Sequence, residues 1–115
     1  KYRYIAYRTS RMKTLHWMGS SLDDLREFPE AARREAGTDL RLVQQGVEPR
    51  DWKPMKTVGK GAREIRVRAA DGAYRVFYVV EDARNVYVLH AFEKTSSKTR
   101  ISDLDIGAQR YRDIP

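Results

Sequence analysis

The chain has 115 residues, of which 41% are hydrophobic, and a formal net charge of +7 at pH 7. This length suits one domain with one core, and the charge favours a polyanionic partner. The sequence contains no cysteine and no apolar run long enough to span a membrane, which excludes disulfide scaffolds, thiolate metal sites, cysteine nucleophiles and a membrane-spanning helix.

The N-terminal part of the chain is predicted to hold a strand followed by two helices. Residues 1–11 are basic and aromatic, and we expect them to be an N-terminal extension ahead of a single domain over residues 12–115. A short strand is expected over residues 13–18. Ser20 or Ser21 is then well placed to cap a first helix, because serine hydroxyls accept hydrogen bonds from free N–H groups at helix starts.

A second helix is predicted to begin at Pro29, since proline suits the first helical position. Its apolar residues recur at helical spacing: Ala32, Ala36, Leu40 and Val43. Gly46 is the expected C-cap. Residues 47–62 contain two prolines and two glycines and are predicted to form a loop.

Three strands and a last helix are predicted in the C-terminal half. The strands cover residues 63–69, 73–80 and 86–92, with an Asp-Gly pair at the first turn. Ser102 is the expected cap of the final helix. The resulting order, β-α-α-β-β-β-α, predicts an α+β fold in which an N-terminal helical pair packs on a small, twisted, mainly antiparallel sheet, with the helices on one face.

Alternation along the strands predicts a basic face on this sheet. In the first of the three strands Ile65 points one way, while Arg66 and Arg68 point the other. In the next strand Tyr74 shares a face with the apolar residues, so Arg75 lies opposite. The face not covered by helices is therefore expected to be cationic.

The charge pattern places the basic residues close to this face. Residues 53–68 hold a single acid, Glu64, which is expected to pair with Arg66 or Arg63. The six bases in the same stretch are Lys53, Lys56, Lys60, Arg63, Arg66 and Arg68. We interpret Lys56, Lys60 and Arg68 as RNA-binding residues that contact phosphates.

The same basic residues have the chemistry that metal-free RNA cleavage requires. The 2′-hydroxyl must lose a proton, charge on the phosphate must be stabilised, and the 5′-oxygen must gain a proton. Arginine suits the second role because its planar fork matches phosphate oxygens, and lysine suits proton transfer if its pKa falls well below about 10.4. The candidate catalytic residues are Arg66, Arg75, Lys94 and Lys98, with both lysines expected in the loop after the last strand.

A metal site is not expected. The sequence has two histidines, His16 and His90, whereas zinc sites use three or four ligands. His90 lies among apolar strand residues and is expected to be a core or edge residue. No cofactor is implied.

The segments in their order resemble the RelE/HigB superfamily of bacterial and phage toxins, especially its phage-derived, HigB-like branch. The matching motifs are W-x-G-S-S-L-x-D-L-x-x-F-P from Trp17, K-P-x-K-x-x-G-x-G-x-x-E-I-R from Lys53, Y-R-V-x-Y from Tyr74, V-L-H-A-F-x-K from Val88, and K-T at Lys98. The chain departs from the pattern at Thr95, where many relatives have lysine, and at Arg100, where many have proline.

This resemblance implies a cytoplasmic, ribonuclease-like domain that cleaves mRNA, usually on the ribosome, by 2′-hydroxyl attack without metal. By position, Arg75 matches the phosphate-stabilising arginine of the family, and Arg66, Lys94 and Lys98 match its basic set. The resemblance also implies a cognate antitoxin, commonly a HigA-like helix-turn-helix protein. The toxin would then bind operator DNA only as part of its complex with this antitoxin.

Two other functions fit the sequence. The first is a non-catalytic RNA- or ribosome-binding module on the same fold. The second is a protein whose basic face docks an acidic polypeptide. The second alternative predicts binding to a partner with little dependence on RNA, whereas binding to RNA phosphates weakens steeply with salt.

Overall fold

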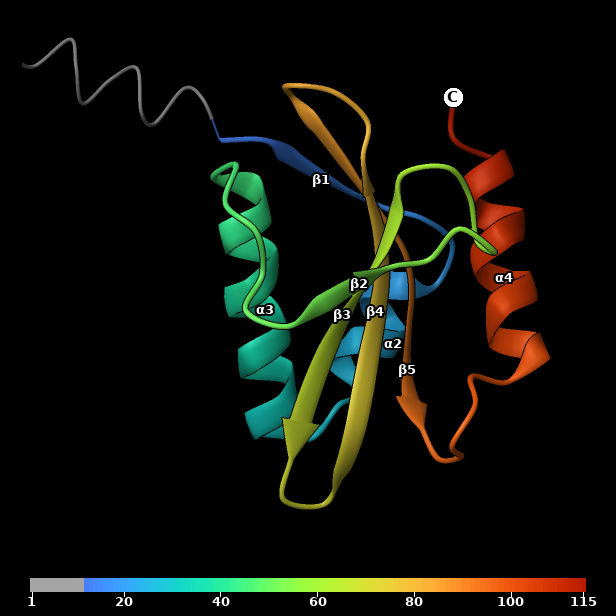
Figure 1. Cartoon of the computed structure of the whole chain (residues 1–115). Helices are drawn as coiled ribbons and strands as arrows, with labels where there is room; N and C mark the ends of the chain where they lie inside the picture. Colours follow the sequence, from blue (N-terminus) through green and yellow to red (C-terminus); the bar gives the residue numbers. More distant parts are fainter. Residues whose placement is uncertain (1–11) are drawn as a thin grey trace, which may run out of the picture.

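A computed structural model describes residues 12–115 and contains one five-stranded sheet with helices on both faces (Figure 1). The elements are β1 (Thr14–Trp17), α2 (Ser21–Arg26), α3 (Glu30–Gln44), β2 (Trp52–Pro54), β3 (Ala62–Ala69), β4 (Gly72–Val80), β5 (Asn85–Lys94) and α4 (Ile101–Arg112). The N-terminal extension expected over residues 1–11 lies outside the described residues. In residues 12–115 no helix is long and apolar enough to cross a bilayer.

The sheet has the order β1-β5-β4-β3-β2. β1 runs parallel to β5, and the other pairs are antiparallel, so the predicted α+β class with a mainly antiparallel sheet is confirmed. The short strand β2 was predicted to be loop. Its three residues include Pro54, which lacks an N–H donor and is tolerated in sheets mainly on edge strands such as this one.

Helices α2 and α3 pack on one face of the sheet. The four apolar residues predicted for the second helix are all buried: Ala32, Ala36, Leu40 and Val43. Phe28, between the two helices, packs against Tyr74 of β4 with ring centroids 4.8 Å apart. Ile65 and Val67 of β3 contribute to the same core. The alternation of apolar side chains along β3 therefore selects the face that the two helices cover.

The predicted end of α3 at Gly46 is confirmed, with Gln45 as the C-cap residue and Gly46 directly after it. Gly46 has φ of +80°, a conformation that glycine adopts without strain. Its N–H donates to the carbonyl oxygen of Val43, and the N–H of Val47 donates to that of Leu42. These two bonds form a Schellman motif, which satisfies carbonyl groups left free at the helix end.

The serines before α2 have other roles than a side-chain cap. Ser20 precedes the helix, but its hydroxyl donates to the carboxylate of Asp24 at 2.7 Å. Ser21 is buried, and its hydroxyl donates to the carbonyl oxygen of Val88 on β5 at 3.2 Å. Ser21 therefore joins the start of α2 to the sheet.

The expectation that the helices share one face is wrong for α4, which packs on the opposite face from α3 (Figure 1). Its partners in this second core include Phe77, Leu89 and Phe92. Phe77 shares a face with Arg75 by strand alternation, so this face is apolar at one end and charged at the other. The helix begins at Ile101 with Arg100 as N-cap residue, so Ser102, the predicted cap, lies inside the helix.

Candidate active site

Basic side chains from three strands meet on the sheet face that α4 partly covers. Arg66 of β3 lies directly opposite Arg75 of β4, and opposed residues have Cβ atoms about 4.5–5.5 Å apart. In the next row towards the β3–β4 turn, Ala73 lies between Arg68 on β3 and Lys94 on β5. The register thus brings Arg66, Arg68, Arg75 and Lys94 together.

Lys94 is the last residue of β5 rather than part of the following loop, which corrects the sequence-based expectation. Its ammonium group donates to the carbonyl oxygens of Ser96 at 2.7 Å and Ser97 at 2.9 Å. Lys98 does lie in the loop and is exposed, and its carbonyl oxygen accepts a bond from the Ser96 hydroxyl. Lys94 therefore fixes the path of the loop that carries Lys98, with one of its three N–H donors left over.

The other two predicted RNA-binding residues, Lys56 and Lys60, lie apart from this group. They belong to the loop between β2 and β3 and are exposed. That loop enters β3 at Ala62, four residues before Arg66, which corresponds to about 13 Å of strand. The hydroxyl of Tyr111 in α4 donates to the carbonyl oxygen of Lys60 at 2.7 Å, so the loop is tied to α4 at the far end of the sheet.

Arg75 is buried beside an acid. Its side chain is 8% exposed and its Nε lies 3.6 Å from Oε1 of Glu64, which is 1% exposed. Burial lowers the pKa of Arg75, and the Glu64 charge opposes this effect; a guanidinium still stays protonated at neutral pH. Burial likewise raises the pKa of Glu64, against the charges of Arg75 and other bases.

The predicted partners of Glu64 are only partly correct. Arg66 does lie near it, with 3.9 Å between Nε and Oε1. Arg63 instead pairs with Glu48 at 3.6 Å and stacks on the ring of Trp52. The Glu64–Arg75 pair was missed because it depends on the register of two strands, for which a single sequence gives no direct signal.

His90 is buried, as expected, and joins β5 to α4. Its Nε2–H donates to Oδ1 of Asp103 at 2.8 Å, and its ring stacks on Phe92 with centroids 4.9 Å apart. Burial lowers the pKa of His90, while the Asp103 carboxylate opposes this shift. The imidazole is therefore neutral at pH 7, and its position suits packing better than proton transfer at the arginine pair.

Thr95 and Arg100, in the segment between β5 and α4, contact each other. Arg100 donates from Nη2 to the hydroxyl oxygen of Thr95 at 2.7 Å. This bond spans the loop between β5 and α4.

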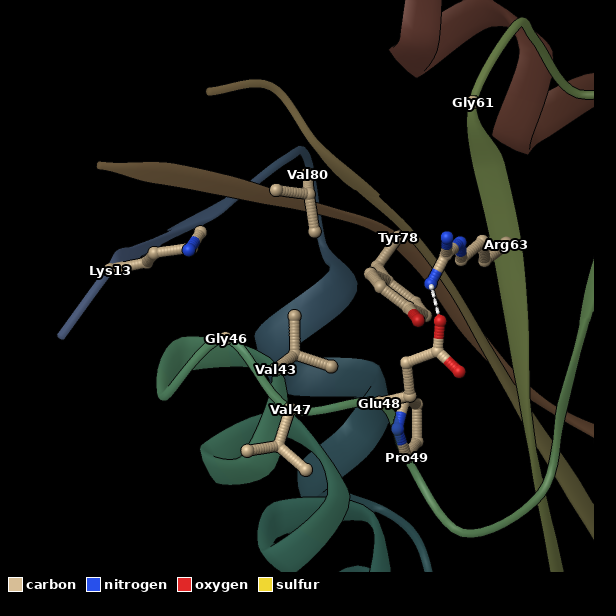
Figure 2. Close-up of a pocket in the computed structure, with 10 residues that line it drawn as sticks. All are labelled: Lys13, Val43, Gly46, Val47, Glu48, Pro49, Gly61, Arg63, Tyr78 and Val80. Atoms are coloured by element: carbon tan, nitrogen blue, oxygen red, sulfur yellow. Dashed lines mark ion pairs between the residues drawn. The ribbon is translucent and has the colours of Figure 1, made fainter. Parts of the chain in front are cut away.

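A separate pocket of about 410 Å³ lies on the α3 side of the sheet (Figure 2). Its apolar walls include Val43, Val47 and Val80. Tyr78 lines it with a buried hydroxyl that has no hydrogen-bond partner among the described residues, beside the Arg63–Glu48 pair. Burial raises the pKa of Tyr78, and Arg63 opposes this. The pocket shares no lining residue with the Arg66–Arg75 group.

Comparisons with known proteins agree with this architecture. Residues 23–112 match the family described as "Phage derived protein Gp49-like". The structure is similar to that of a double arginine-to-alanine mutant of the E. coli toxin RelE in the free state, with a TM-score of 0.61, 15% identity, and coverage of 90% of this chain and 99% of that chain. No curated protein matches significantly. The resemblance to the RelE/HigB superfamily is confirmed at the level of family and fold.

Proposed function

Because the chain belongs to the Gp49-like family of phage-derived proteins and has the RelE fold, we propose that it is the toxin of a type II toxin–antitoxin system and an mRNA endoribonuclease. The observation that supports this most is the direct opposition of Arg66 and Arg75, with Lys94 one row away. Two adjacent guanidinium groups suit the charge that develops on a phosphodiester under attack.

In the proposed reaction the 2′-hydroxyl loses its proton and its oxygen attacks the adjacent phosphorus. The bond from phosphorus to the 5′-oxygen breaks, and that oxygen takes up a proton. The products are a 2′,3′-cyclic phosphate and a 5′-hydroxyl. Arg75 and Arg66 stabilise the phosphate, Lys94 and Lys98 take part in proton transfer, and no metal is required.

We also propose RNA contacts, a substrate, a cellular location and a protein partner. Arg68, Lys56 and Lys60 contact RNA phosphates on either side of the cleavage point. The substrate is mRNA, with cleavage on the ribosome, in the cytoplasm. A HigA-like helix-turn-helix antitoxin binds and silences the enzyme and carries it to operator DNA.

One observation favours the alternative of a non-catalytic RNA- or ribosome-binding module. The Arg75 side chain is 8% exposed, and a guanidinium must be accessible to contact a reacting phosphate. Catalysis therefore requires that RNA binding uncovers Arg75. A binding module would use the more exposed Arg66 and Arg68 without that step.

Inducible expression with mapping of cellular RNA 5′ ends tests the proposal. Wild-type protein is expected to arrest growth and create new 5′-hydroxyl ends in mRNA, and Arg75→Ala is expected to lose both effects, with about 100-fold or greater loss of cleavage. Arg34→Ala, on the exposed surface of α3, is the matched control and keeps both. A folded Arg75→Ala protein with full toxicity would contradict the mechanism. Growth arrest without new ends would favour the binding module.

A further inference from the structure

Glu64 is a buried carboxylate inside the basic group, and the reaction proposed above makes no use of it. It lies on β3, opposite Lys53 of β2 and Phe77 of β4. Neither carboxylate oxygen has a hydrogen-bond partner among the described residues. An acid held so far from water, without hydrogen bonds, is costly unless nearby charges compensate it.

The compensating charges come from the candidate site. Oε1 of Glu64 lies 3.6 Å from Nε of Arg75 and 3.9 Å from Nε of Arg66. The two arginines are directly opposed across the strands, and like charges in that position repel each other. One carboxylate between them removes much of this repulsion.

The contacts are ion pairs without a hydrogen bond, since Nε of Arg75 and both oxygens of Glu64 lack a hydrogen-bond partner among the described residues. Glu64 is close to the Nε atom of each arginine, the inner edge of the fork. Of the outer nitrogens, Nη1 of Arg75 donates to the carbonyl oxygen of Tyr74 at 3.1 Å, whereas the Arg66 side chain is 39% exposed and its fork is accessible. The outer nitrogens of the planar fork can form two parallel hydrogen bonds to phosphate oxygens.

Building on the proposed ribonuclease function, we propose that Glu64 is a positioning residue that holds Arg66 and Arg75 side by side, through their Nε atoms, so that both forks meet one phosphodiester once RNA binding uncovers Arg75. At 1% exposure its carboxylate does not reach the RNA, so it acts through the arginines. A general base, in contrast, would have to lie within hydrogen-bond reach of the 2′-hydroxyl.

This role predicts a pH dependence of cleavage. The charged groups that act most on Glu64 are bases: Arg75 of β4, Lys53 of β2, Arg66 of its own strand β3 and Lys94 of β5. Burial raises the pKa of Glu64 against their combined effect. Glu64 therefore becomes protonated at a higher pH than an ordinary glutamate, and cleavage falls as the pH drops through that raised pKa.

The test compares the wild type with Glu64→Gln and Glu64→Asp on ribosomes programmed with a defined mRNA and on a free RNA oligonucleotide. We expect Glu64→Gln to lower kcat by about 10- to 100-fold, as misplacement of reacting groups does, with a smaller change in KM. We also expect it to lose the acid limb of the pH profile, and Glu64→Asp to recover part of kcat. Glu48→Gln, which loses the Arg63 pair on the other face, is the matched control and keeps the wild-type profile.

Circular dichroism and thermal unfolding establish whether each variant is folded. A folded Glu64→Gln protein with wild-type kcat and acid limb would overturn the proposal. If Glu64→Gln does not fold, Glu64→Asp decides: an unchanged kcat and unchanged acid limb would overturn the positioning role. A wild-type protein that cleaves neither substrate would instead overturn the proposed function, and this inference with it.

Discussion

At the scale of single residues, the buried ionisable side chains join segments that are distant along the chain. Among the described residues, the buried charged or histidine side chains are Asp39, Glu64, Arg75 and His90. Asp39 of α3 accepts from Nε of Arg50 in the following loop at 2.9 Å, which raises the pKa of Arg50. Each such pair fixes one segment against another, because an unpaired buried charge is strongly unfavourable.

His90 makes the stability of the fold depend on pH. Burial lowers its pKa in the folded state, so between the ordinary value of about 6.5 and the lowered value the unfolded chain binds more protons than the folded one. Folding stability therefore falls as the pH drops below about 6.5, by at most about 1.4 kcal/mol per pH unit for one proton. Thermal unfolding from pH 7.5 to 5 is expected to show a falling Tm.

The variant His90→Gln isolates this contribution, because its amide can still donate to Asp103 but does not titrate in this range. Its Tm is expected to change less with pH than that of the wild type. A slope equal to that of the wild type would show that other groups cause the dependence.

At the scale of elements, α4 decides which part of the second sheet face stays open. It covers the end that carries Phe77, and Gly107 allows the close approach. A Cβ atom at Gly107 would lie 2.7 Å from Cδ2 of Phe77. The charged end, beyond Arg75, remains for a ligand, so the packing of α4 defines the boundary of the candidate site.

A pair of glycine-to-alanine substitutions tests this packing, one at the packed Gly107 of α4 and one at the open Gly37 of α3. Gly107→Ala in α4 is expected to destabilise the protein by about 1–3 kcal/mol, because the added methyl group overpacks the core. Gly37→Ala in α3 meets nothing within 4 Å and is expected to stabilise by about 0.5–1 kcal/mol, since alanine favours helix. Urea unfolding measures both, and a stabilising Gly107→Ala would mean that α4 does not pack as described.

At the scale of the whole molecule, the +7 charge and the basic face together favour a nucleic-acid ligand. Most of the affinity should come from phosphate contacts and should fall steeply with salt. An acidic polypeptide partner would instead bind with little dependence on RNA.

We therefore expect the affinity for a single-stranded RNA oligonucleotide to fall by at least about tenfold between 50 and 200 mM salt. Arg68→Ala should reduce the slope of log affinity against log salt by about one phosphate contact. Fluorescence anisotropy measures both, and Arg34→Ala is the control. Affinity that is unchanged over this range would contradict phosphate binding and favour the polypeptide-docking alternative.

The sequence by itself determined the elements whose signals are local. Helical spacing placed Ala32, Ala36 and Leu40 on the buried side of α3, and glycine chemistry placed its end at Gly46. Strand alternation put Arg66 and Arg75 on the opposite face from the helical pair, because side chains in a strand alternate with a period of two.

Only the tertiary structure decided the features that depend on long-range register and packing. The pairing of β3 with β4 created the Glu64–Arg75 contact, and the packing of α4 against Phe77 covered part of a face that was expected to be open. It also separated Lys56 and Lys60 from the arginine pair. Such contacts arise from the free energy of burying whole surfaces against each other, which no local run of residues encodes.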